Sequence, residues 1–243
     1  MVLIRLNKFL SDRGICSRRA ADEHILAGKV LVDGKKASLG QKIDPEKQKI
    51  VLDGSEIKPK KAKFVYYAVN KPRGVVSTAS DEMNRRSVVD LVPKEPRVYP
   101  VGRLDRDSEG LIILTNDGEL TNLLTHPSHL TTKEYKVEIR STKSEILNKS
   151  EIQKIKTGFI NGVKIEDKFM KADSVDIHKD PRSKLYVLNV VLHTGYNRQI
   201  RKMCAKIGLE VLRLKRIRIS NLSLDKLNIK SGEYKIITRK DVL

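Results

Sequence analysis

Closely spaced strand-like segments dominate the chain after residue 64. Branched and aromatic residues recur in FVYYAVNKP, RVYPVGRLD, GLIILTND, EYKVEI, MKADSVDI and KLYVLNVVL, whereas helical spacing is found in ELTNLLTH and RQIRKMCAKIG. These strands are too many and too close together for regular βαβ units, each of which needs a crossover helix. The sequence therefore predicts an α+β domain over residues 64–243, with helices packed on a mixed, mostly antiparallel β-sheet.

The first 60 residues have a different pattern. RLNKFLSDR places its apolar residues at helical spacing, and Ser17 is a typical N-cap for a second short helix. VLVDGKK alternates as a strand does and ends in an Asp-Gly turn, which is a strong hairpin signal, and IVLDG is a further short strand. We therefore predict a small separate domain over residues 1–60. The charged segment KPKKAK, residues 58–63, is interpreted as the linker.

The charge balance indicates the kind of partner. The chain has 49 Lys and Arg against 30 Asp and Glu, a net charge of +19. Such an excess predicts a polyanionic partner, nucleic acid first and an anionic membrane second. The membrane is disfavoured because no segment approaches the roughly 18 apolar residues of a spanning helix. Charged residues also interrupt the N-terminal segment, so we expect no signal peptide.

Cysteine and histidine usage adds two expectations. The chain has two cysteines, far apart in the sequence, so a disulfide framework is implausible and a cytoplasmic location is expected. Together with five scattered histidines they form no metal-ligand pattern, so we expect no metal.

The segment VGRLDRDSEGLIILTNDG, residues 101–118, carries the strongest signal for chemistry. Asp105 lies between two strand-like runs, and a turn between rigid elements is a common place for a catalytic side chain. Arg103 and Arg106 flank it and favour the ionised carboxylate, the form that acts as a base or a nucleophile. The pattern therefore makes Asp105 the candidate catalytic residue.

This segment has two other interpretations. Asp105, Asp107, Glu109 and Gly110 occupy positions one, three, five and six of a calcium-binding EF-hand loop. The twelfth position, which requires a bidentate Glu, is Asn116, and apolar residues fill the positions between. Calcium binding is therefore disfavoured. A surface turn with no chemical role is the second alternative.

The N-terminal order RLNKFL…G-x-x-SRR-A…I-x-x-G-x-V-x-V-DG resembles the alpha-L RNA-binding motif. The resemblance covers about the first 50 residues and rests on order, spacing and turn chemistry together. It implies that five basic residues face a folded RNA: Arg5, Lys8, Arg18, Arg19 and Lys29. The alternative is that they form a solvated basic face without a partner.

GRLDRDSEGLIILTNDG resembles the active-site motif of bacterial ribosomal RNA pseudouridine synthases, in the subgroup that joins an alpha-L module to the catalytic domain. Three more segments follow the family's order: NKPRGVVST, KEYKV and GYNRQIRKMCAKIGLEVLRLKRIRI. The similarity is strongest to members that modify the large ribosomal subunit, with small-subunit targeting left open. It covers nearly the whole chain, although residues 141–185 contain no diagnostic residue.

The resemblance implies roles for individual residues. Asp105 is the catalytic aspartate, acting covalently on the ribose or as a base toward it. Tyr135 stacks on the target uracil and is the candidate for proton handling. Arg201 pairs with Asp105 and holds it in position, and Arg103 enters the RNA stack when the target nucleotide flips out.

The basic run that contains Arg198 and Lys202 is interpreted as a phosphate-binding face. Lys71 and Pro72 are interpreted as the end of a strand rather than as catalytic residues. The implied reaction is the isomerisation of uridine to pseudouridine in a ribosomal RNA stem-loop. It transfers no redox, methyl or phosphoryl group, so we expect no cofactor. We expect a monomer. A catalytically silent RNA-binding or assembly factor is the first alternative function. A different RNA modifier, such as a methyltransferase with an alpha-L module, is the second, but it would need a Gly-rich strand–loop–helix for its methyl donor, which the sequence lacks.

Overall fold

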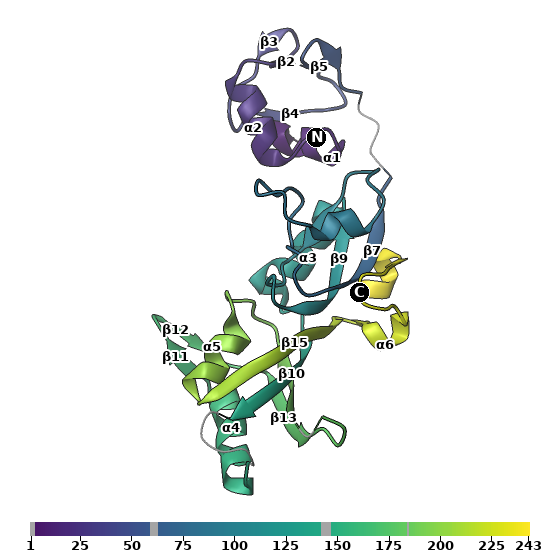
Figure 1. Ribbon diagram of the computed structural model, residues 1–243. Helices are drawn as coiled ribbons and strands as arrows, with labels where there is room; N and C mark the ends of the chain where they lie inside the picture. The colour runs from purple at the N-terminus through teal and green to yellow at the C-terminus, as the bar shows by residue number, and fades with distance from the viewer. Residues whose placement is uncertain (1–2, 59–62, 142–146, 184) are drawn as a thin grey trace. The chain divides into compact units, whose positions relative to one another are not determined.

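The computed structural model describes residues 3–58, 63–141, 147–183 and 185–243 (Figure 1). The chain folds as two compact units. The N-terminal unit contains residues 1–64 together with 95–97 and 116–118, and the C-terminal unit contains the remaining residues. Most of the predicted linker, residues 59–62, lies outside the described residues.

The N-terminal unit is a pair of short helices with a small sheet. Helix α1 (Leu6–Asp12) and helix α2 (Arg18–Leu26) form where helical spacing predicts them. Ser17 caps α2, because its hydroxyl accepts a hydrogen bond from the backbone N–H of Ala20 at 3.1 Å. The strands are β1 (Ile4–Arg5) paired with β4 (Lys42–Ile43), and a sheet in the order β3 (Lys35–Lys36), β2 (Val30–Val32), β5 (Ile50–Leu52) and β6 (Ser55–Glu56).

Two Asp-Gly turns fix the hairpins of this unit. Asp33 and Gly34 both have positive φ angles, of 50° and 80°, as a two-residue hairpin turn of this hand requires. The predicted first hairpin is therefore confirmed. Asp53 and Gly54 repeat the same conformation and add β6, which the sequence analysis did not anticipate. The helices and strands bury a common core that includes Leu6, Phe9, Leu10, Ile25, Val30 and Ile50.

The C-terminal unit is built on a nine-stranded sheet, and the predicted, mostly antiparallel arrangement is confirmed. The one parallel pair among the described strands is β15 with β9. The order is β13 (Ser174–Lys179), β14 (Tyr186–Leu192), β10 (Lys133–Ser141), β15 (Leu209–Ile219), β9 (Glu109–Thr115), β7 (Tyr66–Lys71) and β17 (Tyr234–Ile236), with β16 (Leu222–Ser223) on β15 and β8 (Tyr99–Val101) on β9.

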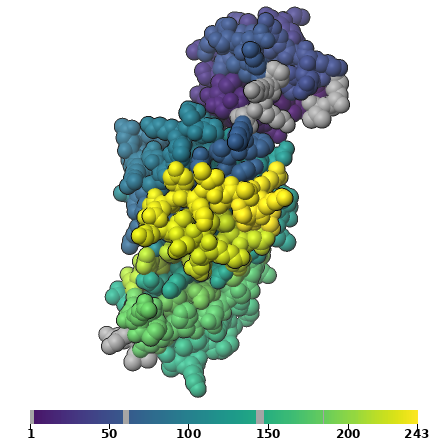
Figure 2. Space-filling model, turned by 90° about the vertical axis from the view of Figure 1, so that its right-hand side faces the viewer, coloured from purple at the N-terminus to yellow at the C-terminus, as the bar shows by residue number. Residues whose placement is uncertain are grey.

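Helices pack on both faces of this sheet. One face carries α4 (Lys149–Asn161) and α5 (Gln199–Lys206), and the other carries α3 (Gly118–Thr125), α6 (Leu224–Leu227) and α7 (Arg239–Val242). Because β9 is covered on both sides, Ile112 and Leu114 belong to one core and Leu111 and Ile113 to the other. The C-terminal segment, yellow in Figure 2, covers the middle of this unit in that view. Two single-turn 3-10 helices lie at Val88–Leu91 and Pro127–His129.

Residues 141–185 show where pattern reasoning missed elements. Helix α4 begins with a capping box, in which the Asn148 and Glu151 side chains each accept a hydrogen bond from the other's backbone N–H. The sequence pattern predicts MKADSVDI as one strand. It instead ends one hairpin, β11 (Val163–Ile165) with β12 (Lys168–Met170), and then enters the main sheet as β13. Among the described residues, no helix combines the length and apolarity that crossing a bilayer demands.

Candidate active site

The turn that carries Asp105 is fixed by hydrogen bonds on both sides. It connects β8 to β9, and its backbone closes where the Ser108 N–H donates to the Asp105 carbonyl at 3.1 Å. The buried hydroxyl of Ser77 donates to the Leu104 carbonyl at 2.8 Å and accepts from the Leu104 N–H at 3.1 Å. Leu104, the residue before Asp105, is therefore held in place, and the Asp105 side chain extends from a backbone that hydrogen bonds fix.

A buried lysine holds the far end of the same turn. Lys71, the last residue of β7, is fully buried, and its ammonium donates to the Ser108 carbonyl at 2.7 Å and to the Pro72 carbonyl at 3.0 Å. Burial lowers the pKa of Lys71 to about 8, although the nearby carboxylates of Asp107 and Asp105 act in the opposite direction. The sequence analysis missed this role. The available signal was a lysine inside an otherwise apolar strand.

The carboxylate of Asp105 faces an arginine. Its side chain is 31% exposed, and Arg198 places a guanidinium nitrogen 3.9 Å from the carboxylate oxygen. The same guanidinium donates two hydrogen bonds to Asp107, at 3.1 and 3.2 Å. Arg198 is the N-cap residue of α5 and has a positive φ angle of 52°. From this position the Arg198 side chain reaches the turn that carries Asp105.

The predicted ion pair between Arg201 and Asp105 is wrong in this structure. Arg201 forms its ion pair with Asp107, at 3.3 Å, and also donates to the Asp107 carbonyl at 3.2 Å and the Val211 carbonyl at 3.4 Å. The reason is that the turn between β8 and β9 places Asp107 next to α5, the helix that carries Arg201. Burial acts to raise the pKa of Asp107, but hydrogen bonds from Arg198 and the charge of Arg201 lower it below its usual value.

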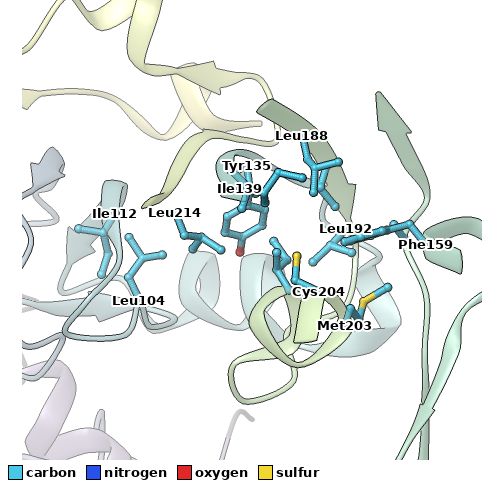
Figure 3. Close-up of a cluster of buried hydrophobic side chains, with 14 of the residues drawn as sticks. Leu104, Ile112, Tyr135, Ile139, Phe159, Leu188, Leu192, Met203, Cys204 and Leu214 are labelled. Carbon is cyan, nitrogen blue, oxygen red and sulfur yellow. The ribbon is translucent and has the colours of Figure 1, made fainter. Parts of the chain in front are cut away.

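A cavity of about 290 Å³ is lined by residues of this turn, of the sheet and of the segment that leads into α5. Tyr135, 8% exposed, lines it from β10, and the apolar side chains of Leu192 and Leu214 lie beside it. Figure 3 shows the Tyr135 ring within the cluster that also contains these two leucines and Cys204. Asp105 and Arg201 line the same cavity. It therefore brings the Tyr135 ring, an apolar wall and the Asp105 carboxylate to one small volume.

A second hollow, of about 920 Å³, adjoins the first. The two share Arg103, Leu104, Asp105 and Arg198, so Asp105 lies where they meet. The second hollow is lined by more cationic than anionic side chains: the arginines are Arg73, Arg85, Arg103, Arg106 and Arg198, and the aspartates are Asp81, Asp105 and Asp107. Its charge suits a phosphate backbone, whereas the smaller cavity suits a planar base.

The structure brings together the predicted residues of the C-terminal unit. Arg103, Asp105, Tyr135, Arg198 and Arg201 all line the smaller cavity. Lys202 follows on α5, where it pairs with Glu166 at 2.9 Å. The remaining predicted RNA-binding residues belong to the N-terminal unit: Arg5, Arg18, Arg19 and Lys29 are exposed there, and Lys8 is half-buried on α1.

Comparison with known proteins agrees with this arrangement. The family model for RNA pseudouridylate synthase matches residues 65–206, and the S4 domain model matches residues 4–59. The dual-specificity RNA pseudouridine synthase RluF of Escherichia coli K12 is 38% identical over 99% of this chain and 77% of its own length. The ribosomal large subunit pseudouridine synthase B of Bacillus subtilis is 36% identical over 98% of this chain and 93% of its own length.

A crystal structure of a pseudouridylate synthase has the same fold, with a TM-score of 0.65, 23% identity and 98% of each chain covered. The fold and the site thus define an RNA-modifying isomerase with an N-terminal S4 domain. The chain belongs to the RNA pseudouridylate synthase family, whose reaction converts uridine in RNA to pseudouridine.

Proposed function

We propose that this chain isomerises a uridine in a stem-loop of large-subunit ribosomal RNA, with Asp105 as the catalytic carboxylate. Two relatives bear names that specify RNA or large-subunit pseudouridine synthesis. The observation that carries the proposal for Asp105 is the shared cavity: its carboxylate and the Tyr135 ring line one volume, and the Arg198 guanidinium lies 3.9 Å from the carboxylate.

The reaction breaks the bond from the ribose C1′ to N1 of uracil, turns the base, and joins C1′ to C5. The proton on C5 is then lost and N1 gains one, so the atoms balance. Asp105 acts either by bonding to the ribose or by removing a proton from it, and both routes need the ionised carboxylate. The Arg198 guanidinium lies 3.9 Å from that carboxylate.

The detached uracil must stay in place while it turns. The Tyr135 ring offers it an aromatic face, which holds a base without imposing one hydrogen-bond register. Leu192 and Leu214 form an apolar wall beside it. The Tyr135 hydroxyl is the candidate group for moving the C5 proton.

Arg201 takes the part of a positioning residue in this proposal. Its ion pair is with Asp107, which shapes the turn, and its charge also interacts with the Asp105 carboxylate. Arg103 is exposed at the junction of the two hollows. There it can fill the space that the flipped nucleotide leaves in the RNA stack and offset part of the unstacking cost.

We further propose that residues 1–60 form the RNA-docking domain and residues 64–243 the catalytic domain. The basic side chains of the first domain, with Arg198 and Lys202 of the second, bind RNA phosphates. The chain is proposed to act as a monomer in the cytoplasm, where ribosomal RNA is its partner.

Mapping pseudouridine in the ribosomal RNA of a strain that lacks this gene tests the proposal. Cyanoethylation followed by mass spectrometry detects the otherwise mass-silent isomer. We expect a large-subunit site to revert to uridine and to be restored by the wild-type gene but not by Asp105→Asn. A silent assembly factor would leave every pseudouridine in place, and a lost small-subunit site would contradict the subunit assignment.

A further inference from the structure

A second tyrosine lines the cavity, and the mechanism above does not use it. Tyr196 lies in the loop between β14 and α5 and is 40% exposed, whereas Tyr135 is 8% exposed. Tyr135 therefore lies inside the cavity, and Tyr196 lies at its solvent-facing side. Tyr196 is therefore an aromatic ring partly open to solvent beside the reaction cavity, a position from which it can stack on a base.

The loop that carries Tyr196 is held from beneath by one buried amide. Gln199 accepts hydrogen bonds at its side-chain oxygen from the Thr194 hydroxyl at 2.9 Å and from the Tyr196 N–H at 3.2 Å. Its side-chain nitrogen donates to the Lys171 carbonyl at 3.3 Å. The backbone of Tyr196 is thus anchored before any ligand arrives, which reduces the entropy that binding would cost.

A cation covers part of the Tyr196 ring. The ammonium of Lys168, an exposed residue of β12, lies 5.0 Å from the ring centroid. The β11–β12 hairpin that carries Lys168 is tied to α5, because the Lys202 ammonium and the Glu166 carboxylate at the hairpin's turn lie 2.9 Å apart. An ammonium group therefore lies over the ring of an exposed tyrosine. A stacked base with its phosphate presents the complementary pair of features.

We propose that Tyr196 and Lys168 bind a nucleotide next to the target uridine, with the Tyr196 ring stacked on its base and the Lys168 ammonium on its phosphate. The proposal rests on the isomerase function. The neighbour is favoured over the target because Tyr135 and the two leucines occupy the enclosed part of the cavity, whereas Tyr196 is open to solvent. Through this site the enzyme contacts the RNA nucleotide that flanks the modified uridine.

A thermodynamic cycle tests the stacking contact. RNA affinity is measured for the wild type and for Tyr196→Leu. Each protein is tested with three hairpins: the intact one, one that lacks the base on the 5′ side of the target uridine, and one that lacks the base on the 3′ side. Because stacking of a base on an aromatic ring is expected to be worth roughly tenfold or more in affinity, Tyr196→Leu should lose that much on the intact RNA. On RNA abasic at one neighbour, wild type and variant should bind alike. Equal losses on all three RNAs would overturn the proposal, as would no loss on any.

A fluorescent probe gives a second readout. The chain has no tryptophan, so Tyr196→Trp introduces a single reporter. Its emission should be quenched by the intact hairpin and not by the hairpin that lacks the contacting base. Tyr234→Trp is the matched control, an equally exposed position (39%) that lines neither hollow. Quenching of the Tyr196→Trp variant that persists on both abasic RNAs would contradict the proposal. Activity of the wild-type enzyme on the same hairpin is measured alongside, so that failure of this inference stays distinct from failure of the isomerase function.

Discussion

The Lys71 ammonium donates a hydrogen bond of 2.7 Å to the Ser108 carbonyl, and so a buried cation closes the turn that presents Asp105. The donor is the last residue of β7 and the acceptor is the residue just before β9, and these two strands are antiparallel neighbours. Lys71 is therefore a positioning residue, and its effect on the reaction passes through the backbone of the turn.

Lys71→Met should lower the single-turnover rate by about tenfold or more, because small misplacements of a catalytic group are costly. RNA affinity should change little, since Lys71 is buried. Affinity and rate measured on one hairpin separate the two effects. A parallel loss of affinity, or an unchanged rate, would contradict a positioning role.

The pH dependence of stability gives an independent check on Lys71. Its pKa is lowered from 10.5 to about 8 in the folded chain, so between these values the unfolded chain binds more protons at this site. The free energy of unfolding should therefore rise with pH across that window in the wild type, relative to Lys71→Met. Urea unfolding of both proteins at several pH values measures the difference. A difference that is constant with pH would show that Lys71 titrates normally.

Arg201 and Asp107 should behave as a coupled pair. Arg201→Gln and Asp107→Asn should each slow the reaction by about 10- to 100-fold, because each loosens the same turn. The double variant should be slowed by less than the product of the two single losses, because the ion pair between the two side chains is lost only once. The Arg198 bonds to Asp107 and the Arg201 bonds to backbone carbonyls belong to one partner each. Single-turnover rates for the four proteins form the cycle. If Arg201 instead acted directly on Asp105, its loss would add to that of Asp107→Asn.

Local signals explain what the sequence could predict. The Asp33-Gly34 turn and the Ser17 cap depend on residues only a few positions apart, so both could be predicted from the sequence alone. The position of Asp105 between two strands was likewise predictable, because the flanking apolar runs mark both. The family resemblance then brought Tyr135 and Arg201 into the same site, where the cavity holds them.

Contacts that join distant segments were not predictable in this way. Lys71 and Ser108 are 37 residues apart, and Arg201 and Asp107 are 94 apart. Which of two carboxylates, Asp105 or Asp107, meets Arg201 depends on how the turn closes and on where α5 begins. The pairing of β12 with β11 likewise depends on tertiary packing, so the MKADSVDI pattern alone could not show that the strand divides.

Tyr135→Phe and Tyr135→Leu should separate stacking from proton transfer. The Phe variant keeps the ring and loses the hydroxyl, so a rate loss of about 100-fold or more is expected if the hydroxyl moves a proton. The Leu variant should lose the stacking face as well and be slower still. Single-turnover product formation measures both. A Phe variant at the wild-type rate would leave the hydroxyl without a catalytic role.

The arginines of α2 should contribute to RNA binding through phosphate contacts. Arg18→Gln with Arg19→Gln should reduce the slope of log affinity against log salt by up to about 0.9 for each lost contact on duplex RNA. The matched control is Lys35→Gln with Lys47→Gln, which removes the same charge from exposed positions of the same unit. Equal slopes for both double variants would mean that α2 does not face the RNA.

The central claim is that the Asp105 carboxylate performs the chemistry. Asp105→Asn keeps the size of the side chain and its capacity for hydrogen bonds while removing the charge. The measurement is single-turnover formation of pseudouridine in a ribosomal RNA fragment, with affinity determined on the same RNA. The account expects no detectable product and nearly unchanged affinity. Activity within about tenfold of wild type would remove Asp105 from the mechanism.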